Sequence, residues 1–116
     1  MTPNDPEKLW KRLLFGLPYG LSALFAVMGL PMALGMVEPN PVYGVRTART
    51  MADPAVWYAA NTTGGTAMVV LGLLSLVIVY LLHRFWGADS DKKLIVPIFV
   101  PVVFTCWSAA IALSHA

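Results

Sequence analysis

The chain has 116 residues, of which 58% are hydrophobic and 12% are charged, and its formal net charge is +2. The charged fraction is about half that of soluble domains, which argues against a soluble protein and indicates a single membrane domain over residues 1–116. The basic residues flank long apolar runs, as the topology signals of membrane proteins do, so we expect no nucleic acid among the partners.

The order of apolar and polar runs predicts an all-α integral membrane protein with three transmembrane helices. Residues 1–12 should form an N-terminal interfacial segment, and span one should cover residues 13–37. A motif-bearing loop and a short helix over residues 38–65 should lead into span two at residues 66–86. Span three should cover residues 94–114. Each run is long enough, because about 20 helical residues cross a hydrocarbon core of about 30 Å.

Local signals refine this outline. Asp53-Pro54 is typical of a helix start, because Asp caps the first turn and Pro fits the first helical position. If the helix that follows runs into span two, Gly64-Gly65 is either a weak point or a point of close contact. Met28, Met32 and Met36 share one helical face of span one, and we interpret them as packing residues and not as a soft-metal site.

The segment over residues 40–61 is unusually polar for its place beside apolar spans. Polar groups at a membrane boundary need partners or a task. We therefore select seven candidate ligand-binding residues in it: Asn40, Tyr43, Arg46, Thr47, Thr50, Trp57 and Asn61.

Arg46 is the centre of any binding mechanism here. Its guanidinium offers five donors in a planar fork, which suits the phosphate of a lipid headgroup or the carboxylate of a peptide terminus. The alternative is that Arg46 pairs with Glu38 or Asp53, or bonds loop carbonyls, and so folds the loop.

The other candidates have the same two interpretations. Trp57 is either an interfacial anchor or lid, or a binding platform. Thr47 and Thr50 either donate hydroxyls to a bound anion or satisfy the loop backbone. Asn40 and Asn61 either bond the backbone of the other's segment or a ligand, and Asn40 is also a natural turn residue.

Catalytic chemistry has little support in the sequence. Both histidines lie outside the polar segment, and Cys106, the single cysteine, lies far from it in predicted span three. No metal-ligand spacing is present, so we expect no catalytic residue, no metal and no cofactor. An enzyme built on Tyr43, Arg46 and Asp53 stays a less favoured alternative.

The basic flanks predict the orientation, because cytoplasmic flanks collect Lys and Arg. One side of the predicted spans carries six basic residues: Lys8, Lys11, Arg12, Arg84, Lys92 and Lys93. The other side carries two, Arg46 and Arg49. We therefore expect the N-terminus in the cytoplasm and the polar segment and C-terminus outside.

The polar segment resembles the SdpI family of bacterial membrane proteins. The residues that carry the resemblance are Asn40, Tyr43, Gly44, Arg46, Thr47, Thr50, Trp57 and Asn61. Val45 departs from the family pattern, where an aromatic residue is common, and the chain is similar to a short, three-span member. The resemblance covers roughly Glu38 to Ser114. It implies a multi-pass protein of the bacterial inner membrane, of the immunity or signalling class.

Two functional hypotheses follow. In the first, the motif binds a peptide or a lipid headgroup, and the protein confers tolerance to a membrane-active peptide or relays a signal. Its partners would be membrane lipids and an antimicrobial or signalling peptide. In the second, the chain is a structural or transport subunit that forms a homo-oligomer or pairs with a larger membrane protein.

Overall fold

The computed structural model describes residues 5–86 and 92–116. Within these ranges the chain is helical and has no strand, which confirms the all-α prediction. Three helices are long and apolar enough to cross a membrane, as predicted: Pro6–Ala33, Pro54–Phe85 and Lys92–Ser114. They form an elongated bundle of 58 × 27 × 21 Å. The loop predicted after span two falls mostly on residues 87–91, outside the described residues.

Helix α1 (Pro6–Ala33) joins the predicted interfacial segment and span one in one continuous helix. The Asp5 carboxylate accepts the Glu7 backbone N–H at 3.1 Å and so caps its first turn. The helix ends four residues before the predicted end of span one. Gly35 has a φ of 69°, and the next amide, that of Met36, donates to the Pro31 carbonyl at 3.0 Å. This glycine-terminated cap ends the helix.

Helix α3 (Pro54–Phe85) begins where the sequence predicts. The Asp53 carboxylate accepts the Ala55 N–H at 2.9 Å, and Pro54 occupies the first turn. The helix then runs through Gly64-Gly65 and span two without a break. It is preceded by the short helix α2 (Ala48–Ala52).

Small residues let the other two long helices approach α3 closely. A Cβ added at Gly65 would lie 2.6 Å from the Cβ of Met32 in α1, and one added at Gly64 would lie 2.7 Å from the Cβ of Ala112. A Cβ at Gly72 would lie 2.9 Å from that of Ala26. The Gly64-Gly65 pair is therefore a point of close contact, one of the two predicted alternatives.

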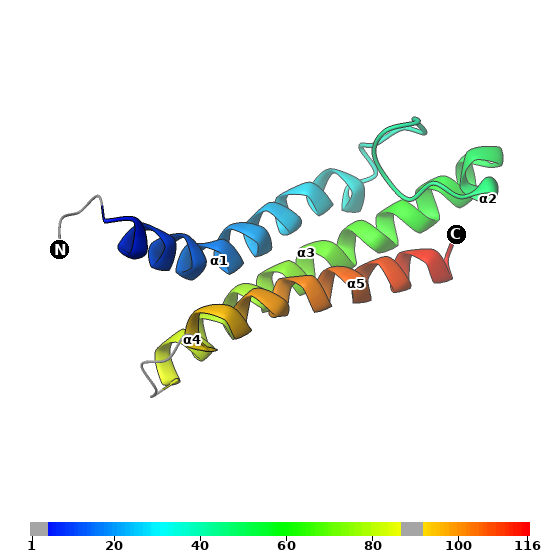
Figure 1. The fold of residues 1–116 in the computed structure, drawn as a ribbon. Helices are drawn as coiled ribbons and strands as arrows, with labels where there is room; N and C mark the ends of the chain where they lie inside the picture. The colour runs from blue at the N-terminus through cyan, green and yellow to red at the C-terminus, as the bar shows by residue number, and fades with distance from the viewer. Residues whose placement is uncertain (1–4, 87–91) are drawn as a thin grey trace.

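The third span is built from α4 (Lys92–Ile95), the 3-10 turn η1 (Val96–Ile98) and α5 (Phe99–Ser114). Its last part, α5, lies antiparallel to α3 (Figure 1). The motif loop and the C-terminus lie at one end of the bundle, and the start of α1 and the end of α3 lie at the other (Figure 1). The motif segment is thus held over one end of three packed helices.

Candidate functional site

Asn40 shapes the first half of the motif loop. Its side-chain oxygen accepts the backbone N–H groups of Val42 at 3.0 Å and Tyr43 at 2.7 Å. Its amide nitrogen donates to the carbonyls of Glu38 at 2.7 Å and Tyr43 at 3.0 Å. These four bonds use both donors and the acceptor oxygen of the side chain, so Asn40 acts here as a turn residue.

Asn61 and Trp57 hold two points of the loop against α3: Asn61 holds Val45, and Trp57 holds the start of the loop at Val37. The Asn61 oxygen accepts the Val45 N–H at 2.6 Å, and its amide donates to the Trp57 carbonyl at 2.9 Å. Trp57 is fully buried, and its indole N–H donates to the Val37 carbonyl at 2.9 Å. Gly44, with a φ of 115°, lies over both: an added Cβ would be 2.7 Å from the Asn61 oxygen.

Thr47 and Thr50 form a reciprocal cap at the start of α2. The Thr47 N–H donates to the Thr50 hydroxyl oxygen at 2.7 Å, and the Thr50 N–H donates to the Thr47 hydroxyl oxygen at 3.2 Å. Thr50 is 1% exposed. Both hydroxyls therefore serve the loop backbone, as in a capping box.

Arg46 is exposed, and its guanidinium donates to the Pro41 carbonyl. Among the described residues it forms no ion pair with Glu38 or Asp53. Of the predicted alternatives, the contact in the structure is the one to a loop carbonyl. This is the one hydrogen bond of the guanidinium within the described ranges, and the side chain is exposed, so its other donors can reach the surroundings. Arg49 is also exposed and donates to the Ala116 carbonyl at 3.2 Å.

The last candidate, Tyr43, ties the loop to α1. Its hydroxyl donates to the Met28 carbonyl, and burial raises the pKa of the phenol above its usual value of 10.0. The structure thus brings the seven candidate residues together in the folded loop, α2 and the start of α3, where their polar groups bond the loop and its supporting helices. Their contact with a ligand stays a prediction.

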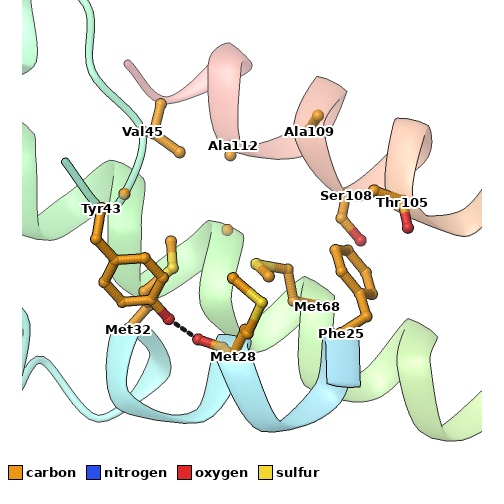
Figure 2. Close-up of a pocket in the computed structure, with 12 residues that line it drawn as sticks. Phe25, Met28, Met32, Tyr43, Val45, Met68, Thr105, Ser108, Ala109 and Ala112 are labelled. Carbon is orange, nitrogen blue, oxygen red and sulfur yellow. Dashed lines mark hydrogen bonds between the residues drawn. The ribbon is translucent and has the colours of Figure 1, made fainter. Parts of the chain in front are cut away.

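Beneath this loop lies a cavity of about 260 Å³ between α1, α3 and α5 (Figure 2). We call it the groove. Its lining residues are Phe25, Met28 and Met32 of α1, Tyr43, Gly44 and Val45 of the loop, Gly64 and Met68 of α3, and Thr105, Ser108, Ala109 and Ala112 of α5.

None of the residues that line the groove is charged, and its hydroxyls are already engaged. Tyr43 donates to the Met28 carbonyl, while Thr105 and Ser108 donate to carbonyls of their own helix at 2.6 and 2.9 Å. A polar ligand would thus lose its bonds to water and find no free donor. The groove suits an apolar, uncharged group.

The groove is open to the outside along α1 and α5. Met28 is 42% exposed, and Thr105 and Ala109 are exposed. The opening therefore lies between α1 and the Lys92–Ser114 segment, each of which is long and apolar enough to cross a membrane, and we expect it to face lipid.

Sequence reasoning missed the groove. The sequence predicts Met28, Met32 and Met36 as packing residues. Met28 and Met32 also form part of one wall of the groove, and Met36 lies beyond the end of α1. A signal that could have pointed to it is the set of small residues on two helices, Gly64 and Ala109 among them, which leave space at one depth.

The comparisons with known proteins agree with the resemblance noted in the sequence. A model described as the SdpI/YfhL protein family matches residues 36–114, which is about two thirds of the chain. The match covers the motif loop, α2, α3 and the third span. No curated protein and no solved structure matches the chain.

Proposed function

We propose that this chain, which belongs to the SdpI/YfhL protein family, binds an apolar segment of a membrane-active peptide in the groove. Binding would confer tolerance to the peptide or relay a signal of its presence. The observation that supports this proposal is the open, uncharged groove whose hydroxyls are all engaged.

The size and lining of the groove indicate the kind of segment that fits. A volume of about 260 Å³ is at or below the lower end of the range for small-molecule pockets, and suits one or two apolar side chains. Met28, Met32 and Met68 supply flexible thioether side chains, which adapt to ligands of different shape. A helix that lies along α1 and α5 within the membrane can place such side chains in the groove.

Arg46 supports the choice of a peptide with an anionic group near its apolar segment. Val45 lines the groove, and the next residue, Arg46, is exposed with donors to spare. A carboxylate or a lipid phosphate at the membrane boundary can therefore meet Arg46 while the apolar part enters the groove. In this proposal Arg46 keeps its predicted role of binding a phosphate or carboxylate, and the main binding surface is the groove and not the motif.

The basic flanks support a bacterial inner membrane location with the motif loop outside. The start of α1, with its cluster of Lys and Arg, lies at the same end of the bundle as the end of α3, and the motif loop lies at the other end (Figure 1). Arg84 is in the last turn of α3. In this orientation the groove lies near the outer surface, where a secreted peptide arrives first.

Replacing either of two neighbouring alanines of α5 with phenylalanine tests the binding proposal. Ala109→Phe fills the groove from an exposed position, and Ala110→Phe adds the same side chain at an exposed position outside the groove. The full chain in nanodiscs is exposed to a synthetic amphipathic Leu/Lys helix that carries photo-leucine. We expect Ala109→Phe to lower photolabelling about tenfold, equivalent to about 1.4 kcal/mol, and Ala110→Phe to leave it unchanged. Equal labelling of both variants would contradict the proposal.

Two further measurements separate the sources of the ligand. A photoactivatable phospholipid replaces the peptide in the same experiment; if it alone labels the groove, the ligand is a lipid acyl chain. Arg46→Lys keeps the charge but loses the planar fork. We expect it to weaken labelling by a peptide with a free carboxylate and not by its amidated form.

The alternative, a structural subunit of an oligomer, is favoured by one observation: the motif side chains bond the loop and its supporting helices. It predicts that Arg46→Ala, which removes the bond to the Pro41 carbonyl, changes oligomer size or lowers thermal stability in detergent without an effect on photolabelling. A monodisperse monomer with unchanged melting would rule it out.

A further inference from the structure

At the end of the bundle opposite the motif loop, a histidine is buried between α1 and α3. His83 is 7% exposed. Its ring stacks on Phe15 of α1, with centroids 4.2 Å apart and planes at 18°. Its Nδ1 lies 3.0 Å from the hydroxyl of Tyr19, also of α1. We call these three residues the His83 latch.

The second ring nitrogen of His83 has no hydrogen-bond partner in the part of the chain that the structure describes. Nε2 is the one buried side-chain nitrogen or oxygen without a hydrogen bond in residues 5–86 and 92–116. A neutral ring leaves one nitrogen unpaired, as a donor or an acceptor depending on the tautomer. A protonated ring has N–H on both nitrogens, so it would bury a charged donor with no acceptor, which is much less favourable.

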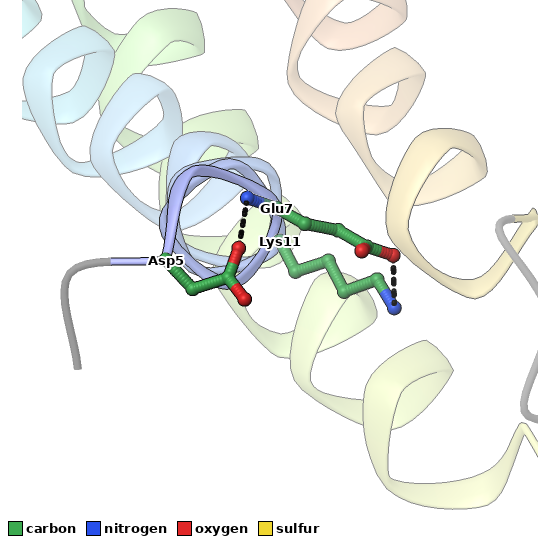
Figure 3. A network of polar contacts seen from close by, with 3 residues as sticks. All are labelled: Asp5, Glu7 and Lys11. Atoms are coloured by element: carbon green, nitrogen blue, oxygen red, sulfur yellow. Dashed lines mark hydrogen bonds and ion pairs between the residues drawn. The ribbon is translucent and has the colours of Figure 1, made fainter. Parts of the chain in front are cut away.

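Within residues 5–86 and 92–116, no carboxylate forms an ion pair with His83. Tyr19 faces the ring from α1, and Lys93 of α4 is a cation whose charge repels a protonated ring. On α3, Tyr80 is close enough to Tyr19 to interact with it electrostatically, and Arg84, the residue after His83, is cationic. Among the described residues the one carboxylate in an ion pair is that of Glu7, which is bound to Lys11 at 3.5 Å (Figure 3).

The geometry points to a protonation-sensitive latch: we propose that neutral His83 holds the N-terminal half of α1 on α3 and that a proton from the adjacent aqueous phase releases it. The stack on Phe15 and the bond to Tyr19 are the contacts that would be lost. A buried ionisable residue in a membrane helix is a functional candidate by default, and here its missing partner gives it a specific role.

Release of this contact would reach the groove through α1 itself. The same continuous helix carries Tyr19 of the latch and Phe25 and Met28 of the groove wall. Between them Ser22 and Ser75 form the next bond from α1 to α3, at 2.7 Å. The part of the inference that concerns the groove rests on the proposed function; the movement of α1 does not.

The movement is measured on the full chain in nanodiscs with Cys106→Ser, which removes the one native thiol. Spin labels are placed on the exposed residues Leu13 of α1 and Leu81 of α3, and their distance distribution is recorded between about pH 7.5 and about pH 5, the range in which histidines titrate. We expect a reversible widening toward longer distances at the lower pH.

Three variants assign the change. His83→Phe keeps an aromatic ring on Phe15 and should abolish the pH response. His115→Gln changes the only other histidine and should keep it. Tyr19→Phe removes the hydroxyl and leaves a histidine that titrates, so it should also keep a response. A wild-type distance that does not change with pH, or a response that survives His83→Phe, would overturn the inference.

Photolabelling by the Leu/Lys helix at both pH values tests the link to the groove. A change of about twofold or more in the wild type that is absent in His83→Phe supports the link. If the distance responds to pH while labelling stays constant, the link is wrong. If Ala109→Phe has no effect on labelling but the distance still responds, the proposed function fails and the latch stands.

Discussion

Replacing Asn61 with Ala should release the motif loop from α3. Asn61 is 2% exposed and accepts the Val45 N–H at 2.6 Å, so truncation leaves a part-buried amide without an acceptor. An unpaired group of this kind costs about 1–3 kcal/mol, and the lost bond to the Trp57 carbonyl adds about 1 kcal/mol. We expect the free energy of unfolding to fall by about 2–4 kcal/mol.

The measurement is unfolding in mixed micelles, paired with hydrogen exchange of the loop. The matched control is Thr66→Ala, on the same helix: Thr66 is exposed and its hydroxyl donates to its own helix at 2.8 Å, so its loss should cost no more than about 0.5 kcal/mol. The Val45 amide should exchange faster in Asn61→Ala and at the wild-type rate in Thr66→Ala. Wild-type stability and a protected Val45 amide in Asn61→Ala would refute this account of the loop.

Two more predictions concern helix packing and the loop tyrosine. Gly65→Ala should cost about 1–3 kcal/mol, because its Cβ would lie 2.6 Å from that of Met32, whereas Gly16→Ala, with nothing within 4 Å, should be neutral or slightly stabilising; thermal melting in detergent compares them. For Tyr43, the raised pKa means that the fold favours the neutral phenol. Its contribution to stability is complete below pH 10.0, the unfolded value, and is lost as the pH rises above it, so the difference in melting temperature between wild type and Tyr43→Phe should shrink there. A difference that is constant across this range would contradict the role of Tyr43.

The helices were predictable because their signals are local. Asp53-Pro54 caps and starts α3 with neighbouring atoms alone, and the length of each apolar run sets its ability to span a bilayer. Helix α1 ends four residues before the predicted end of span one, although the apolar pattern continues after Ala33. The stop depends on the backbone of Gly35, whose positive φ is a property of the turn and not of hydropathy.

The sequence identifies the polar residues that gather in the motif segment, but not whether their side chains point toward a ligand or toward the protein itself. The i, i+4 spacing correctly puts Trp57 and Asn61 on one helical face, yet it does not say whether the face meets a ligand or the chain. The loop turns back onto that face at Gly44. Only glycine fits there, because its φ is 115° and an added Cβ would lie 2.7 Å from the Asn61 side-chain oxygen. The groove depends on residues as far apart in sequence as Phe25 and Ala112, so no local pattern contains it.

The hydrogen bonds of the loop separate two tasks within the site. Gly44, Trp57 and Asn61 fix the shape of the loop, and the polar groups of Trp57 and Asn61 bond the protein itself. If the proposed function holds, a change of ligand places no demand on them, whereas an added side chain at Ala109 alters the space of the groove. Under the proposed function, such a protein can keep its motif and change its ligand through the groove. It follows that ligand preference should follow the α1 and α5 residues of the groove, and that the motif by itself identifies a loop and not what the protein binds.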